Sequence, residues 1–146
     1  GYLAAPVELV EMLTEPRHTL SINTCTISQY AALAALNGPQ EPVDAMIDEY
    51  AERRAWLMPA LTEAGFSYGH PGGAFYIYTN VSSSGLPSPL FCEQLLQKTG
   101  VMVFPGTMFG DTSTDYIRIS YLQPLPLIQE AMERIASFTS HTRSST

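Results

Sequence analysis

Positive charge is scarce in this sequence. Lys and Arg account for seven of the 146 residues and Asp and Glu for 14, so the formal net charge is −7. Nucleic-acid binding requires clustered basic side chains that neutralise phosphates, and we therefore expect no nucleic-acid partner. No apolar run approaches the roughly 20 residues of a membrane span, and no signal-like segment opens the chain. We expect a soluble, cytoplasmic protein without a membrane partner.

Cysteine is scarce too. Cys25 and Cys92 are too few to define a disulfide framework, and we expect both to be reduced, mostly buried thiols. The three histidines show no metal-ligand spacing with each other or with the cysteines, so we expect no metal site. Residues 111–115, DTSTD, lack the glycine and the glutamate of a calcium-binding loop, and a polar turn is expected there. His70, within YGHPGG, is expected to be a loop histidine rather than a catalytic base.

Charged residues of either sign are fewer than in most soluble domains. They make up 14% of the chain, whereas a typical soluble domain has about 25%. The mean hydropathy is +0.02, which is high for a free-standing surface. We therefore expect some apolar surface to face a partner. The length suits one domain with a buried core.

Apolar spacing predicts two short helices near the start of the chain. The first begins with Pro6 at its first helical position and stops at Pro16, because a proline inside a helix breaks the helical hydrogen-bond ladder. The second covers Ile27–Leu36 and ends at Asn37 and Gly38 in a left-handed turn.

The longest predicted helix begins at Pro42. Gly65 acts as its terminator, and Pro59 should kink it. Glu49 and Arg53 are four residues apart in the favoured order, which we expect to add roughly a few tenths of a kcal/mol. One apolar stripe runs along this helix: Val43, Met46, Ile47, Tyr50, Leu57, Leu61 and Ala64.

The apolar period changes from about 3.6 to 2 beyond this helix, which predicts strands. The expected strands are Ala74–Thr79, Val101–Phe104 and Tyr116–Tyr121. The expected helices between and after them are Ser88–Gly100, with Ser88 as N-cap, and Pro124–Phe138. The predicted fold is α/β, a two-layer sandwich in which helices cover a small, mostly antiparallel sheet of about three strands, with a long kinked helix leading in.

Arg118 is the one basic residue that interrupts a predicted strand. By the period of two, it shares a strand face with Tyr116 and Ser120, opposite the two neighbouring isoleucines. A guanidinium fixed on a strand can grip a planar carboxylate through two hydrogen bonds. The simpler alternative is that Arg118 reaches water or pairs with a local acid, Asp111 or Asp115.

Several segments favour the carboxylate-binding interpretation. The run GVMVFPGTMFGDTSTDYIRIS, from Gly100 to Ser120, resembles the C-terminal domain of class I/II pyridoxal-phosphate aminotransferases. PGGAFYIY from Pro71 to Tyr78 is similar to the first small-domain strand of that family. INTCTISQYAALAAL from Ile22 to Leu36 is similar to the helix that enters the small domain, and GYLAAP to the stretch after the cofactor lysine. The likeness extends to about Thr139.

The resemblance implies roles for individual residues. Arg118 matches the strand arginine that holds the substrate's α-carboxylate, and Phe109 and Gly110 would then border the substrate side chain. The alternative for Phe109 is that it packs beneath the loop. Tyr76 and Tyr78 are expected on a strand face packed by helices, without a chemical role. No catalytic residue is expected, because the Schiff-base lysine of the family has no counterpart here. Lys98, the only lysine, falls at a helix end, where a cation suits the helix dipole.

The resemblance also implies that the chain is a fragment that is inactive alone. Residues 1–139 would be the small domain with preceding linker helices, and residues 140–146 a flexible tail. The full-length protein would bind pyridoxal 5'-phosphate through a missing large domain, form a homodimer and act on an amino acid and a 2-oxo acid, whereas the fragment would bind no cofactor.

Other functions remain open at this stage. The parent could be a pyridoxal-phosphate lyase or synthase, or an aminotransferase-like transcription regulator with the same fold. The chain could also be a stand-alone module that binds carboxylates through Arg118.

Overall fold

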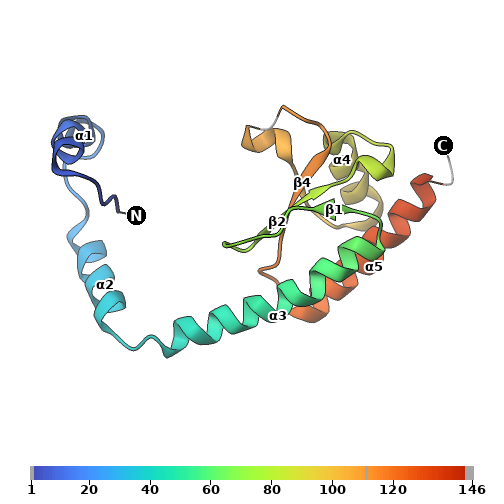
Figure 1. Ribbon diagram of the computed structural model, residues 1–146, viewed down its shortest axis with the longest axis horizontal. Coiled ribbons are helices and arrows are strands. Elements are labelled where there is room, and N and C mark those ends of the chain that lie inside the picture. Colours follow the sequence, from blue (N-terminus) through green and yellow to red (C-terminus); the bar gives the residue numbers. More distant parts are fainter. Residues whose placement is uncertain (1, 111, 144–146) are drawn as a thin grey trace. The chain divides into compact units, whose positions relative to one another are not determined.

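The computed structural model describes residues 2–110 and 112–143 (Figure 1). The chain forms two compact units, Gly1–Pro42 and Val43–Thr146. Within the described ranges, no helix combines the length and apolar character that crossing a bilayer needs.

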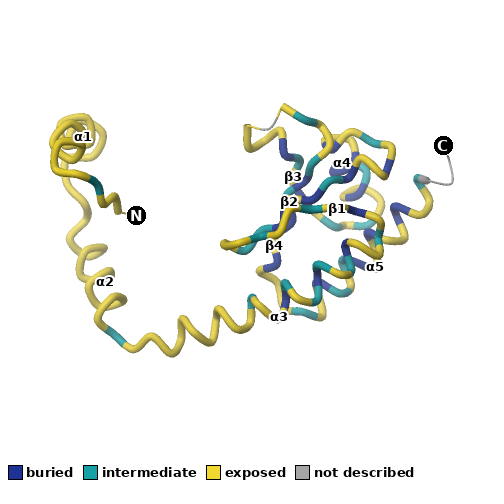
Figure 2. The backbone as a smooth tube through the Cα atoms, in the orientation of Figure 1, coloured by how far each residue is buried: buried dark blue, intermediate teal, exposed yellow. Residues whose placement is uncertain are grey.

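The first unit holds two helices, α1 (Val7–Leu20) and α2 (Thr26–Asn37), and neither has a buried residue (Figure 2). The prediction that the first helix stops at Pro16 is wrong, because α1 passes through this residue for another turn. A proline inside a helix removes one hydrogen bond but does not prevent the next ones. The N–H of Ser21, beyond the proline, donates to the Arg17 carbonyl at 2.9 Å.

The left-handed stop predicted at Gly38 is also wrong. Gly38 has φ −80° and an extended backbone. Its N–H donates to the Ala34 carbonyl at 2.8 Å. A Cβ at this position would lie 2.7 Å from that same carbonyl oxygen, so glycine is required here for close approach rather than for a positive φ.

The long helix α3 (Glu41–Glu63) runs through Pro59 without a break, and the kink expected there stays a prediction. Only the second half of α3 enters the core, where Arg53, Leu57 and Leu61 are buried. The predicted apolar stripe therefore faces the core only along its second half. Its first three members, Val43, Met46 and Ile47, are exposed, and Tyr50 and Ala64 pack partly buried against the core.

Gly65 ends α3 as predicted. Its φ is +83°, its N–H donates to the Thr62 carbonyl at 2.9 Å, and the N–H of Phe66 donates to the Leu61 carbonyl at 3.0 Å. This pair of hydrogen bonds is the Schellman motif, in which the residue after the glycine also packs against the last helical turn. Phe66 and Leu61 are both buried.

The sheet has four strands in the order β1-β2-β4-β3, and every neighbouring pair is antiparallel. The strands are β1 (Ser67–Tyr68), β2 (Tyr76–Asn80), β3 (Phe104–Pro105) and β4 (Tyr116–Ser120). The small antiparallel sheet is therefore confirmed, with one strand more than expected. β1 could not be predicted from the sequence, because a strand of two residues is too short to show an alternating pattern.

All three predicted strands have different bounds in the structure, although the last differs only by ending at Ser120 instead of Tyr121. The first starts at Tyr76 rather than Ala74, because Ala74 has a φ of +57°, which no extended strand accommodates. The Ala74 carbonyl accepts a hydrogen bond from the Tyr121 hydroxyl at 2.8 Å instead. The strand predicted at 101–104 is reduced to Phe104 and Pro105, the only residues there that pair with β4.

Helices cover one face of this sheet (Figures 1 and 2). They are the second half of α3, α4 (Ser88–Thr99) and α5 (Leu125–Arg143), and two 3₁₀ turns, η1 (Ser82–Ser84) and η2 (Gly106–Phe109), lie in the loops. The buried apolar cluster joins these helices to β2, β4 and the loops: Leu57, Leu61, Phe66, Ile77, Val81, Phe91, Cys92, Leu95, Val103, Ile117, Ile119, Tyr121, Ile128, Met132, Ile135 and Phe138.

Two helix ends differ from the predictions. Ser88 is the first helical residue rather than the N-cap, because the Pro87 carbonyl already accepts the N–H of Phe91 at 2.9 Å. α5 continues past Phe138 to Arg143, and buried Thr139 extends its packed face beyond the predicted end. Residues 144–146 lie outside the described residues, and the flexible tail stays a prediction.

Buried Arg53 ties α3 to the chain after β4. It donates to the Leu122 carbonyl at 2.6 Å, forms the predicted ion pair with Glu49, and lies 5.5 Å from the Tyr50 ring centroid. The Glu49 and Arg53 pair is thus confirmed.

The two cysteines differ in environment. Cys92 is a free thiol in the core, as predicted, and burial raises its pKa to about 11. Cys25 is exposed, so its predicted burial is wrong. Backbone N–H groups of Ser28 and Ile27 at the start of α2 lower the pKa of the Cys25 thiol.

Candidate functional site

The two faces of the sheet are chemically different. On the face covered by helices, Ile77 lies opposite Ile119 and Thr79 opposite Ile117, and all four are buried. Strand alternation puts Arg118 on the other face, as the sequence predicts. Its partner in the register of β2 is Tyr78, and its partner in β3 is Phe104.

Tyr76 and Tyr78 are on this same second face, so the prediction that helices pack against them is wrong. Antiparallel register places Tyr78 opposite Arg118 and Tyr76 opposite Ser120. Ile77 between them takes the core side and is fully buried, which turns both tyrosines away from the helices.

The Arg118 guanidinium lies against two aromatic rings from two different elements. Its central carbon is 4.2 Å from the centroid of the Tyr76 ring on β2 and 3.5 Å from that of the Phe109 ring at the end of η2. Both distances are well inside the roughly 6 Å range of a cation–π contact. Arg118 Nε is buried and has no hydrogen-bond partner among the described residues.

No acid neutralises this arginine within residues 2–110 and 112–143. The ion pairs found there join Arg53 to Glu49 and Arg134 to Glu130. Asp115 forms none with Arg118, so that half of the local-acid alternative is wrong; Asp111, the other candidate, lies outside the described residues. A half-buried guanidinium with free donors can bind an anion, and its planar fork suits a carboxylate.

Phe109 thus contacts Arg118. The residue is 46% exposed, so it does not simply pack beneath the loop. Gly110 follows with a φ of +87° and closes the turn by donating to the Gly106 carbonyl. A substitution at Gly110 would meet open space but an unfavourable backbone conformation.

Sequence reasoning missed two aromatic residues of this site. The sequence predicts no functional role for Tyr76 and only a strand position for Phe104. The ring centroids of Phe104 and Phe109 are 6.5 Å apart. Alternation within Tyr76–Asn80 already places Tyr76 and Tyr78 on one face. Pairing that strand with the one carrying Arg118 would have brought Tyr76 to the guanidinium.

The family follows from comparison with known proteins. Residues 1–135 match the sequence profile of the family Aminotransferase class I and II. The chain belongs to this family. Among the aminotransferases that it resembles is the LL-diaminopimelate aminotransferase of Desulforudis audaxviator, which is 38% identical over 135 residues, 92% of this chain and 34% of that protein. The aspartate aminotransferase of Bacillus sp. strain YM-2 is 38% identical over 144 residues, 94% of this chain and 36% of that protein.

Solved aminotransferases share the fold. The crystal structure of an aromatic aminotransferase from Pyrococcus horikoshii matches with a TM-score of 0.87 and 34% identity, over 96% of this chain and 38% of that one. The fold class and the family resemblance predicted from the sequence are therefore confirmed. The chain spans about a third of the length of the curated aminotransferases that it matches.

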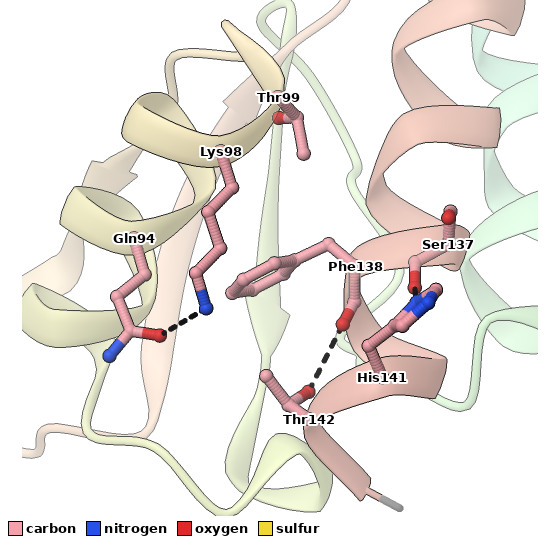
Figure 3. A pocket seen from close by; sticks show the side chains of 7 residues that line it. All are labelled: Gln94, Lys98, Thr99, Ser137, Phe138, His141 and Thr142. Carbon is pink, nitrogen blue, oxygen red and sulfur yellow. Dashed lines mark hydrogen bonds between the residues drawn. The ribbon is translucent and has the colours of Figure 1, made fainter.

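Aminotransferases of this family use pyridoxal phosphate, and a lysine must hold it covalently. Lys98, the only lysine in the sequence, does not fit this role (Figure 3). Its Nζ donates to Gln94 Oε1 at 3.4 Å and lies 5.5 Å from the Phe138 ring centroid, in a groove between α4 and α5. These helices cover the sheet face opposite Arg118. The described residues thus do not fit covalent attachment of the cofactor.

The described residues also contain no candidate metal site. Among the described residues, no three His, Cys, Asp or Glu side chains gather where they could hold a metal ion.

Proposed function

We propose that this chain is the substrate-carboxylate-binding part of an aminotransferase that moves an amino group between an amino acid and a 2-oxo acid. The observation that carries the proposal is the Arg118 guanidinium, set between two rings with no acidic partner among the described residues. The chain would work with the large cofactor-binding domain of the family, in a homodimer, and would be inactive alone. Pyridoxal phosphate, bound outside this chain, would supply the electron sink.

Arg118 would bind and orient the substrate. Two parallel N–H to oxygen bonds fix both the position and the plane of a carboxylate, so the rest of the amino acid points in one direction. Holding a reactant in a single orientation removes much of the entropic cost of reaching the transition state. The strand position of Arg118 supports this role, because β4 is an inner strand that pairs with a neighbour on both sides.

The named relatives support transamination over the other functions that the sequence leaves open. LL-diaminopimelate, aspartate and aromatic aminotransferases all match over more than nine-tenths of this chain. We therefore favour an aminotransferase over a lyase, a synthase, a transcription regulator or a stand-alone carboxylate-binding module.

The first prediction concerns Arg118 in the whole protein that contains this chain. We expect Arg118→Ala to lower kcat/KM for amino acids by about 100-fold, the scale of a charge-assisted bidentate contact. Arg118→Lys should recover little, because an ammonium lacks the planar fork. Steady-state kinetics with an amino acid and with the matching amine that lacks the carboxylate measures the effect, and the loss should be confined to the amino acid.

Arg134→Ala is the matched control. Arg134 lies on α5, pairs with Glu130 and donates to the Thr99 carbonyl, all in the helical layer on the other side of the sheet. We expect its kcat/KM to stay near that of the unmodified protein. An Arg118→Ala protein with unchanged kcat/KM for amino acids would contradict the proposed function.

A further inference from the structure

We propose that Tyr76 and Phe109 are positioning residues that hold the Arg118 guanidinium for carboxylate binding. This inference rests on the proposed function, because it assumes that Arg118 binds the substrate. It adds that aromatic rings orient the guanidinium, which has no acidic partner among residues 2–110 and 112–143. The set of Tyr76, Phe109 and Arg118 is called the arginine clamp below.

The sheet register brings Tyr76 to Arg118. Tyr76 lies opposite Ser120, two residues after Arg118, so the tyrosine and the arginine are diagonal neighbours on one face. Tyr78 is directly opposite Arg118, yet its ring stacks on Tyr116 instead, with centroids 5.3 Å apart and planes 8° from parallel. Of these three tyrosines, only Tyr76 has its ring over the guanidinium.

Phe109 approaches from a different direction, because it comes from the loop before β4. η2 ends at this residue, and the left-handed backbone of Gly110 turns the chain away immediately afterwards. The edge of the Phe104 ring meets the Phe109 ring at an interplanar angle of 81°. This contact and the turn together fix the ring 3.5 Å from the guanidinium carbon.

Aromatic neighbours restrain a guanidinium without using its hydrogen-bond donors. An aspartate or glutamate in the same place would occupy the fork of N–H groups that the substrate needs. A ring attracts the cation through its face and leaves the edge of the guanidinium free. The buried Nε, which has no partner among the described residues, shows that the clamp does not consume that donor.

The test uses the whole protein, loaded with its cofactor, and measures binding of 3-phenylpropanoate, a carboxylate without an amino group to transfer. Calorimetry gives the Kd for Phe109→Leu and Tyr76→Leu, which remove one ring each. We expect the Kd to rise roughly fivefold to tenfold in each, the range of a partly desolvated cation–π contact. Phe109→Tyr and Tyr76→Phe keep the rings and should bind within about twofold of the unmodified protein.

Tyr116→Leu is the matched control, because Tyr116 is on the same sheet face but stacks on Tyr78 and not on Arg118. Its Kd should not change. Thermal midpoints identify any variant that fails to fold. Phe109 is the safer position, because the residue is exposed and lies outside the buried apolar cluster.

Kinetics separates positioning from direct substrate contact. If Phe109 acts through Arg118, Phe109→Leu should raise KM by the same factor for an aromatic and an aliphatic amino acid and change kcat less. A rise confined to the aromatic amino acid would mean that Phe109 borders the substrate side chain, and would overturn the inference.

Arg118→Ala distinguishes a failure of the proposed function from a failure of the arginine clamp. If it leaves the Kd for 3-phenylpropanoate unchanged, the proposed function itself fails. If it weakens binding while Phe109→Leu and Tyr76→Leu bind normally, only the arginine clamp fails.

Discussion

Thr79 places a hydroxyl group in the core. The residue is fully buried on the helix-packed face of β2, opposite Ile117, and its Oγ1 has no hydrogen-bond partner among the described residues. A buried polar group without a partner loses its hydration and gains nothing in return.

We therefore expect Thr79→Val to stabilise the protein by about 1 kcal/mol, since a methyl group replaces the unpaired hydroxyl. Chemical denaturation with a fixed m-value measures the change. Thr139→Val is the control, because the Thr139 hydroxyl is equally buried but donates to the Ile135 carbonyl at 2.7 Å. It should not gain stability, and equal losses in the two variants would contradict the prediction.

At the site, the sequence alone predicts the direction of one side chain but not the contacts between side chains from different elements. The face on which Arg118 projects follows from strand alternation and was predictable. The Phe109 contact was not, because it depends on how η2 and Gly110 shape the loop. The contact between Tyr76 and Arg118 was missed because it depends on the pairing of β2 with β4. The sequence pattern of a single strand does not show which other strand it pairs with.

At the scale of elements, the end of α3 is held by backbone geometry. Gly65 has a φ of +83° and supports both hydrogen bonds of the Schellman motif. Any residue with a Cβ is strained in this conformation, and the strain would act at the point where α3 turns into β1.

Gly65→Ala should destabilise the protein by about 1 kcal/mol or more. Gly69→Ala is the comparison, because Gly69 has no positive φ and an added Cβ would meet nothing within 4 Å. Thermal unfolding of both variants measures the difference. A Gly65→Ala midpoint equal to that of Gly69→Ala would show that the left-handed turn is not needed.

The sequence predicted the existence and order of the elements better than their ends. Periodicity found all five helices and three of the four strands. The predicted helix ends at Pro16 and Phe138 were wrong, because α1 continues to Leu20 and α5 to Arg143. At Gly38 the end of α2 was right but the predicted left-handed backbone was wrong. β3 is only two residues long because a strand is defined by its hydrogen-bonded pairing, here with β4, and not by apolar character alone.

At the scale of the whole molecule, burial is confined to one of the two units. α1 and α2 have no buried residue and carry exposed apolar side chains, whereas the apolar cluster lies entirely within the second unit. Helices of 14 and 12 residues are marginal in water when tertiary packing does not support them.

We expect amide hydrogen exchange of this chain by itself to separate the two units. Peptides from α1 and α2 should exchange within seconds, and those from β2 and β4 should be protected by global stability. Mass spectrometry of timed deuterium labelling measures this. Equal protection of α2 and β4 would contradict it, because α2 would then need packing that its exposure does not show.

The sheet's outer strands have a consequence for association between molecules. β1 and β3, at the two margins, are two residues long each, and β3 contains Pro105, which has no N–H to donate. Each of these edge strands offers an incoming strand a ladder of at most two residues, which disfavours association by strand addition to β1 or β3.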